Sequence, residues 1–320
     1  MAVIAVFIIR LALFDNPLAW RGYKRVFPSD NLSYLTAKRA LDRFRNLELL
    51  PRRLDYLIVG SSLPLTALGA FKELIPNSEY LHVYGMRVME YVFCEKEVES
   101  FNPSRVLLYA TIYDLGHVAG PEKYQAFYSL GDLKSWFFNA QSKRLPREAR
   151  PELYLGKILA GCLFPEYRYS SFFREAVERF LGRPAQSMVR GKKTEEVLKI
   201  RIDRQIGNVR SLSGASVDIN LFFLEEFLRF CGKKKIDVVI LEGHISPLVE
   251  TPPIRELHSV TMRKLSQMSL RYAHVRWVPA SELVRLEDED FSDMIHAKPE
   301  ASVKYSQSVL AYLNREKLSG

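Results

Sequence analysis

The sequence predicts an α/β fold: a three-layer sandwich with about five parallel strands and a largely helical insertion. Short, nearly continuous apolar runs are typical of strands covered on both faces of a sheet. They alternate with segments of helical periodicity, and strands separated by helices pair in parallel through right-handed crossovers. The 320 residues are 48% apolar and 26% charged, which excludes a disordered chain and a multi-span membrane protein.

Five strands and five helices are expected outside the insertion. Apolar runs predict strands at residues 54–59, 80–84, 105–109, 236–241 and 275–278. Helical spacing predicts helices at residues 63–74, 88–98, 219–230, 253–272 and 299–313. Pro64 and Pro299 fall in first turns, where a helix does not need the missing N–H.

This order divides the chain into four segments. Residues 1–50 are an apolar stub with a helical lead-in. Residues 51–115 and 216–320 form the two parts of one α/β domain. Residues 116–215 are too long for a plain connection, so we expect a basic helical insertion that serves as a lid or docking element.

The positive charge is concentrated in this insertion. Residues 141–210 contain 16 Lys or Arg against 8 Asp or Glu, and so hold +8 of the formal net charge of +9. The stretch is either a solvated face or a surface that attracts phospholipid head groups or an anionic glycopolymer. Nucleic acid is the weakest of these choices, since no helix-turn-helix, zinc-finger or RNA-binding signature accompanies the charge.

The apolar run from Ala2 to Phe14 leaves three interpretations open. As a helix its 13 residues would cover about 20 Å, less than the roughly 30 Å hydrocarbon core of a bilayer. The run is a short membrane anchor, a signal-like targeting helix, or a core or interface helix. The first two place the protein at a membrane or outside the cytoplasm, and the third leaves a cytoplasmic protein as the alternative.

No metal or organic cofactor is expected. Cys94, Cys162 and Cys231 lie far apart with no C-x-x-C pair, so we expect buried apolar thiols rather than a disulfide framework or a zinc site. Neither a G-x-G-x-x-G nor a Walker A pattern occurs, which argues against nucleotide chemistry. The acidic run 287–290 is interpreted as a solvated loop.

Two strand ends carry candidate catalytic groups. Gly60-Ser61-Ser62-Leu63 follows the first strand and opens a helix, which would expose a serine at the edge of the sheet where ligands bind. The alternative is that Ser61 or Ser62 only caps the helix. After the last strand, Asp293 and His296 are three residues apart, so one turn can place a carboxylate on the imidazole of a general base.

Together these two points resemble the SGNH (GDSL-type) hydrolase superfamily, which has a flavodoxin-like sandwich. Gly60-Ser61-Ser62 occupies the place of the family's G-D-S block, with Ser62 in the nucleophile position. Asp293 and His296 match the family's Asp and His. The resemblance implies that Gly85, just after the second strand, supplies an N–H to the oxyanion hole.

One block departs from the family pattern. The family has G-x-N-D after the third strand, whereas this chain reads Thr111-Ile112-Tyr113-Asp114. Asp114 matches, but Tyr113 replaces the asparagine, and Thr111 or Tyr113 would have to donate through a hydroxyl. The Gly-Ser-Ser form is similar to the membrane-tethered branch that includes DltD and alginate-acetylation proteins.

The remaining histidines are weaker candidates. His244 follows the fourth strand and is predicted to line the substrate cleft, while His117 could reach the same pocket. His82 is expected to be structural, and His258 and His274 have no recognisable partners in the sequence.

The resemblance implies a serine esterase or O-acyltransferase that acts on an acyl ester of a carbohydrate or cell-envelope polymer. The alternative is a non-catalytic envelope-assembly protein of the same fold that binds an anionic polymer or a membrane. A nucleic-acid binder is a third hypothesis, and nucleic acid is not an expected partner.

Overall fold

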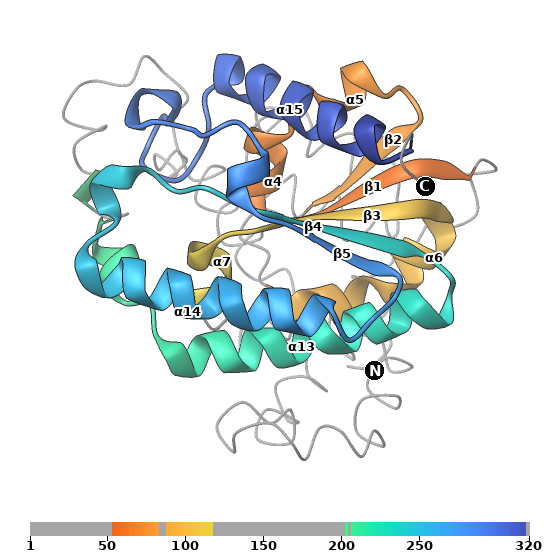
Figure 1. The fold of residues 1–320 in the computed structure, drawn as a ribbon, viewed down its shortest axis with the longest axis horizontal. Coiled ribbons are helices and arrows are strands. Elements are labelled where there is room, and N and C mark those ends of the chain that lie inside the picture. The colour runs from red at the N-terminus through yellow and green to blue at the C-terminus, as the bar shows by residue number, and fades with distance from the viewer. Residues whose placement is uncertain (1–52, 83–87, 118–201, 204–205, 318–320) are drawn as a thin grey trace, which may run out of the picture. The chain divides into compact units, whose positions relative to one another are not determined.

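The computed structural model describes residues 53–82, 88–117, 202–203 and 206–317 (Figure 1). All of them belong to one compact unit, which spans residues 51–119 and 192–320. The apolar run 2–14, Gly85, Cys162 and most of the expected insertion lie outside the described residues. Among the described helices, none combines the length and the apolar character needed to cross a bilayer.

A five-stranded, all-parallel sheet forms the middle layer, as predicted. Its strands are β1 (Leu54–Gly60), β2 (Ser78–His82), β3 (Pro103–Ala110), β4 (Asp237–Glu242) and β5 (Val275–Val278). They lie in the order β2-β1-β3-β4-β5. The chain moves outward from β1 to β2 and then returns past β1 to β3. The carboxyl ends of β1 and β3 therefore flank the point where the strand order reverses, which is where open α/β sheets bind ligands.

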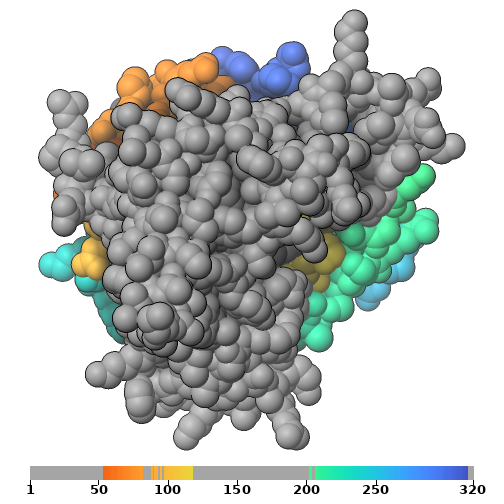
Figure 2. Space-filling model, turned by 180° about the vertical axis from the view of Figure 1, so that it is seen from behind, coloured from red at the N-terminus to blue at the C-terminus, as the bar shows by residue number. Residues whose placement is uncertain are grey.

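Helices cover both faces of the sheet (Figure 1). One layer contains α4 (Ser62–Ala67), α5 (Phe71–Leu74) and α15 (Pro299–Lys317). The other contains the 3₁₀ turn η1 (Val88–Cys94), α6 (Glu95–Phe101), α13 (Gly214–Lys233) and α14 (Pro252–Ser269). Figure 2 shows the same grouping from behind: the blue atoms of α15 lie beside orange atoms of the first strand–helix unit, and the green atoms of α13 lie apart from them.

Aromatic side chains fill the core on both sides of the sheet. Tyr56 of β1 packs edge-on against Phe71 of α5, with ring centroids 5.5 Å apart. In the opposite layer Tyr91 packs against Phe227 of α13 at 5.7 Å. Burial of both sheet faces explains why the strands appear in the sequence as unbroken apolar runs. Cys94 and Cys231 are buried in the core, as expected.

The prediction of one continuous helix over residues 63–74 is wrong in one respect, because the structure has two helices there, α4 and α5. The turn between them approaches α15 closely: the Ala70 N–H donates to Ser302 Oγ at 3.2 Å. A Cβ at Gly69 would lie 3.0 Å from both Leu65 O and Ser302 Oγ. The break thus depends on a contact with a helix more than 200 residues away. Other boundaries differ as well: β2 begins two residues before the predicted strand, α13 begins five residues before the predicted helix, and the helix expected at 88–98 begins as η1 and continues as α6.

Candidate active site

Ser62 is the first residue of α4, directly beyond the carboxyl end of β1. The chain turns sharply at Gly60, whose φ of +153° disfavours any residue with a side chain. A Cβ there would also lie 2.7 Å from Pro64 Cγ. Gly60 therefore allows β1 to end in a tight turn that places Ser62 at the reversal point of the sheet.

The two adjacent serines have different roles. Ser61 is buried and caps α4, because its Oγ accepts from the Leu63 N–H at 3.1 Å. The same hydroxyl donates to Asp114 Oδ2 at 3.3 Å. Ser62 is half-buried, and its Oγ lies 2.8 Å from His296 Nε2. The N-cap interpretation thus applies to Ser61, and the hydroxyl of Ser62 meets the imidazole.

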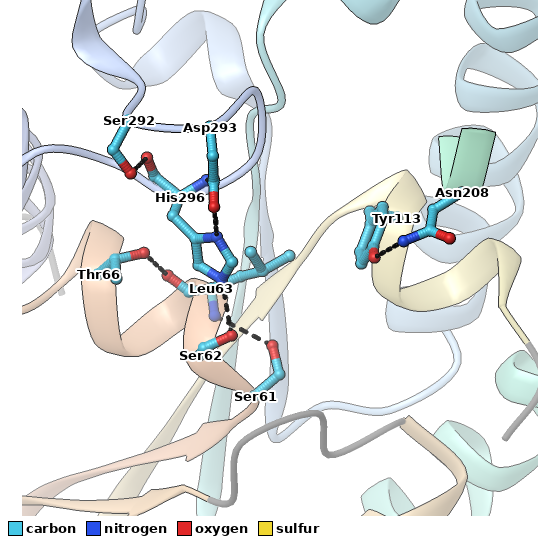
Figure 3. Close-up of polar contacts among 9 residues, drawn as sticks. All are labelled: Ser61, Ser62, Leu63, Thr66, Tyr113, Asn208, Ser292, Asp293 and His296. Atoms are coloured by element: carbon cyan, nitrogen blue, oxygen red, sulfur yellow. Dashed lines mark hydrogen bonds and ion pairs between the residues drawn. The ribbon is translucent and has the colours of Figure 1, made fainter. Parts of the chain in front are cut away.

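His296 and Asp293 complete a hydrogen-bonded chain with Ser62 (Figure 3). His296 Nδ1 lies 2.8 Å from Asp293 Oδ1 and 3.0 Å from Oδ2. The fold brings together a serine and a histidine that are 234 residues apart in the sequence. The order of contacts, hydroxyl to imidazole to carboxylate, is that of a serine-hydrolase triad.

The loop that carries Asp293 and His296 is held by its own main chain. Phe291 and Ala297 form an antiparallel bridge at its base. The Ser292 N–H donates to His296 O at 2.8 Å, and the His296 N–H donates to Asp293 Oδ1 at 3.1 Å. Met294 at the tip has a φ of +72°, a conformation that costs free energy and needs support from the surroundings.

The contact with Asp293 determines which nitrogen of His296 carries the proton. Burial raises the pKa of Asp293, but the hydrogen bond from His296 and its charge outweigh burial and hold the pKa below its usual value. An ionised carboxylate can only accept hydrogen bonds, so Nδ1 must donate. In the neutral imidazole Nε2 is then the acceptor that faces the Ser62 hydroxyl, as a general base requires.

The block after β3 lies beside this triad. Thr111 is fully buried, and its Oγ1 caps α7 (Ile112–Gly116) by accepting from the Asp114 N–H at 3.0 Å. Asp114, also buried, receives the hydrogen bond from Ser61 and so joins the two turns that follow β1 and β3. Thr111 and Asp114 therefore hold the turns in place.

Tyr113 has a partner that sequence analysis missed. Its hydroxyl accepts from Asn208 Nδ2 at 3.3 Å, and its ring meets the His117 ring edge-on at 4.8 Å. Figure 3 shows Tyr113 and Asn208 to one side of the Ser62–His296 pair. Asn208 is 95 residues from Tyr113 and belongs to no motif, so only a residue-contact signal across homologues could have identified it.

The structure does not place His244 in direct contact with the triad. Its ring packs edge-on against Tyr305 at 5.7 Å, and its main-chain N–H donates to Tyr109 Oη at 2.8 Å. Burial lowers the pKa of His244 to about 4, so the ring is neutral at physiological pH. Its expected place in a substrate cleft stays a prediction.

Three sequence interpretations need correction. His258 has partners, because it lies between Glu242 and Glu250, and His274 Nε2 lies 2.9 Å from Leu228 O. The acidic run is not simply solvated, since Asp288 Oδ1 accepts from Ser246 Oγ at 2.6 Å and Asp290 pairs with Lys304.

Within the described part of the chain, no group of three His, Cys, Asp or Glu side chains is placed to hold a metal ion.

No protein-family model and no curated protein matches the sequence. Two solved structures are similar over most of the chain. A proposed acylhydrolase from Bacteroides fragilis shares 10% identity, covers 85% of this chain and 94% of its own, and has a TM-score of 0.41. A proposed platelet activating factor from Streptococcus pneumonia shares 9% identity, covers 93% and 99%, and has a TM-score of 0.43. At these TM-scores and identities, neither likeness bears on the activity of this chain.

Proposed function

We propose that this protein is a serine esterase or O-acyltransferase of the SGNH type. The observation that carries the proposal is the continuous chain of hydrogen bonds from Ser62 through His296 to Asp293, at 2.8 Å for each link. The chain lies at the strand-order reversal of a five-stranded parallel sheet, where this class of fold binds its ligands.

The geometry supports acyl transfer through a covalent intermediate. His296 Nε2 takes the proton of the Ser62 hydroxyl as Oγ attacks the ester carbonyl carbon. The tetrahedral intermediate collapses when His296 returns that proton to the leaving alcohol and the C–O bond breaks. Water or an acceptor hydroxyl then attacks the acyl-serine with His296 as the base, the bond between the acyl carbon and Ser62 Oγ breaks, and His296 returns the proton to Oγ. Asp293 stays ionised and holds the imidazole in the required tautomer.

The oxyanion of the intermediate needs hydrogen-bond donors near Ser62. The resemblance assigns the N–H groups of Ser62 and Gly85 to this task, and Tyr113 stands where the family has an asparagine amide. A phenol can accept one hydrogen bond and donate another. We therefore include Tyr113 in the oxyanion hole, with its hydroxyl oriented by Asn208.

A fluorophosphonate probe tests the proposal directly, because it labels only an activated serine. We expect the wild-type protein to be labelled and Ser62→Ala to abolish labelling, while Ser281→Ala, which removes an exposed hydroxyl from the loop after β5, leaves it intact. Labelling that survives Ser62→Ala would remove this residue from the mechanism. Absence of labelling in the wild type would favour a non-catalytic protein of the same fold.

Tyr113→Phe is expected to lower kcat by up to about 10²-fold with little change in KM, since one hydroxyl that acts on the transition state is lost. Steady-state kinetics with 4-nitrophenyl acetate would measure the effect. Tyr272→Phe is the matched control, because this phenol bonds to Glu225 and Arg229 beyond the opposite end of the sheet. An unchanged kcat in Tyr113→Phe would exclude the phenol from the oxyanion hole.

For the substrate we propose an acyl ester on a carbohydrate or anionic cell-envelope polymer, at a membrane or outside the cytoplasm. Support comes from the similarity of the Gly-Ser-Ser form to the membrane-tethered branch and from the +8 charge of residues 141–210. The same charge favours the second candidate, a non-catalytic envelope-assembly protein. That candidate predicts binding to anionic liposomes or polymers that weakens steeply with salt, and no probe labelling.

A further inference from the structure

A half-buried histidine outside the triad lies between two carboxylates. His258 of α14 places Nε2 at 3.2 Å from Glu242 Oε1 and Nδ1 at 3.7 Å from Glu250 Oε1. The imidazole side chain is only 19% exposed. Glu242 is anchored on its other side, because Oε2 accepts from the Ala280 N–H at 3.0 Å. Both ring nitrogens therefore lie within ion-pair distance of a carboxylate, and nearby negative charge favours the imidazolium.

The two carboxylates stand at the ends of one loop. Glu242 is the last residue of β4, and Glu250 follows the 3₁₀ turn η6 (Pro247–Val249) that leads into α14. By pairing with both, His258 ties together the ends of the segment 243–250. The Glu250 N–H also donates to Pro247 O at 3.1 Å, so the clamp and η6 are directly connected.

The segment 243–250 supports the loop that carries Asp293 and His296. The Ser246 N–H donates to Met294 O at 2.8 Å, between Asp293 and His296 in the chain and at the residue with the positive φ. Ser246 Oγ and the Leu248 N–H both donate to Asp288 Oδ1, at 2.6 and 3.0 Å. In Figure 1 the chain leaves β4 and β5 beyond the same edge of the sheet at which α4 begins.

Charged groups from β4 and from the loop after it set the pKa of His258. Burial alone would lower its pKa, but Glu242 from β4 and Glu250 from the loop outweigh burial and raise the pKa to about 9. The same pairing holds the pKa of Glu242 below its usual value against the effect of burial. His244, on the loop itself, is neutral above about pH 4, and Arg285 adds a positive charge that acts on His244. His258 is thus charged at neutral pH and loses its proton only in alkaline solution.

We propose that His258 is a positioning residue: as a cation it clamps Glu242 to Glu250, and the clamped loop holds Met294 and thereby the Asp293–His296 turn in its working geometry. The kinetic part of this inference rests on the proposed hydrolase function, whereas the structural part does not. Because the pKa is raised in the folded state, the stabilisation is complete below the unfolded value near 6.5 and is lost as the pH rises through about 9.

Hydrogen–deuterium exchange of the full chain tests the clamp without requiring activity. After correction for the intrinsic rate, we expect the peptides covering 243–250 and 291–297 to exchange faster at about pH 10 than at about pH 7 in the wild type. His258→Gln should show the fast exchange at both pH values. His274→Gln, which alters a histidine bonded to a carbonyl of α13, should behave as the wild type. Exchange of these peptides that is independent of both pH and His258→Gln would overturn the proposal.

The kinetic arm uses 4-nitrophenyl acetate over the same pH range. We expect kcat to fall above about pH 9 in the wild type, and to be about 10-fold lower at neutral pH in His258→Gln with this alkaline fall absent, because a small displacement of the base is costly. An alkaline fall that persists unchanged in His258→Gln would assign it to another group and contradict the inference. If the wild type shows neither turnover nor probe labelling, the hydrolase function fails while exchange still decides the role of His258.

Discussion

His296→Ala is expected to lower kcat/KM for a simple acyl ester by about 10⁴-fold or more. Without the imidazole, which lies 2.8 Å from Ser62 Oγ, no described group bonded to this hydroxyl can take its proton during attack. The leaving alcohol also loses its proton donor, so both bond-making and bond-breaking are slowed. Because Ser62 and His296 act as one unit, Ser62→Ala and the double variant should show losses of similar size.

Hydrolysis of 4-nitrophenyl acetate would measure this loss, with His274→Ala as the matched control. His274 is also a partly buried histidine with one main-chain partner, Leu228 O, but it belongs to the turn before β5. Its replacement should leave kcat/KM close to the wild-type value. A loss below about 10²-fold in His296→Ala would fall short of general-base catalysis and contradict the assigned role.

Asp293→Asn is expected to lower kcat by about 10⁴-fold at neutral pH while the fold is retained. The amide that replaces the carboxylate would donate to Nδ1, so Nε2 would carry the hydrogen and could no longer accept the Ser62 proton. Because the pKa of Asp293 is held below its usual value, the carboxylate of the wild type is ionised at neutral pH, and its contribution to stability is lost only in acid, as the pH falls through that lowered pKa.

Asp218→Asn provides the control for this prediction, since Asp218 is an exposed carboxylate that pairs with Lys264 on the surface. Measurement of kcat together with the thermal unfolding temperature separates a chemical loss from a folding defect. An Asp293→Asn variant that folds and keeps kcat within about 10-fold of the wild type would show that the carboxylate does not select the tautomer.

The architecture and the triad could be predicted because their signals are local. Strands such as β1 and β4 lie between two helical layers, so nearly every side chain is apolar and the run is visible in sequence. Ser62 and the Asp293–His296 pair follow directly after strand ends or precede a helix, and the carboxyl ends of parallel strands share one edge of the sheet. Strand-end position therefore predicted that these groups share one edge of the sheet, and the resemblance to the SGNH superfamily added the expectation that Ser62 meets His296.

Other features were decided only by tertiary contacts. The choice of Ser62 over Ser61 depends on Asp114, which engages Ser61 from another strand end. The break after α4 depends on Ser302 of the last helix. Each is set by residues tens to hundreds of positions apart, and neither hydrophobic periodicity nor a short motif carries information over such distances.

The partners of Tyr113 and His258 show the same division. Asn208 meets Tyr113 across 95 residues, and His258 lies between carboxylates from a strand end and from the loop that precedes its own helix. The sequence by itself determined the α/β class, the parallel sheet and the strand ends that carry the serines, Asp293 and His296, because burial and strand-end position leave local patterns. Only the tertiary structure decided which polar groups support that triad, because their pairing depends on how closely separate elements pack.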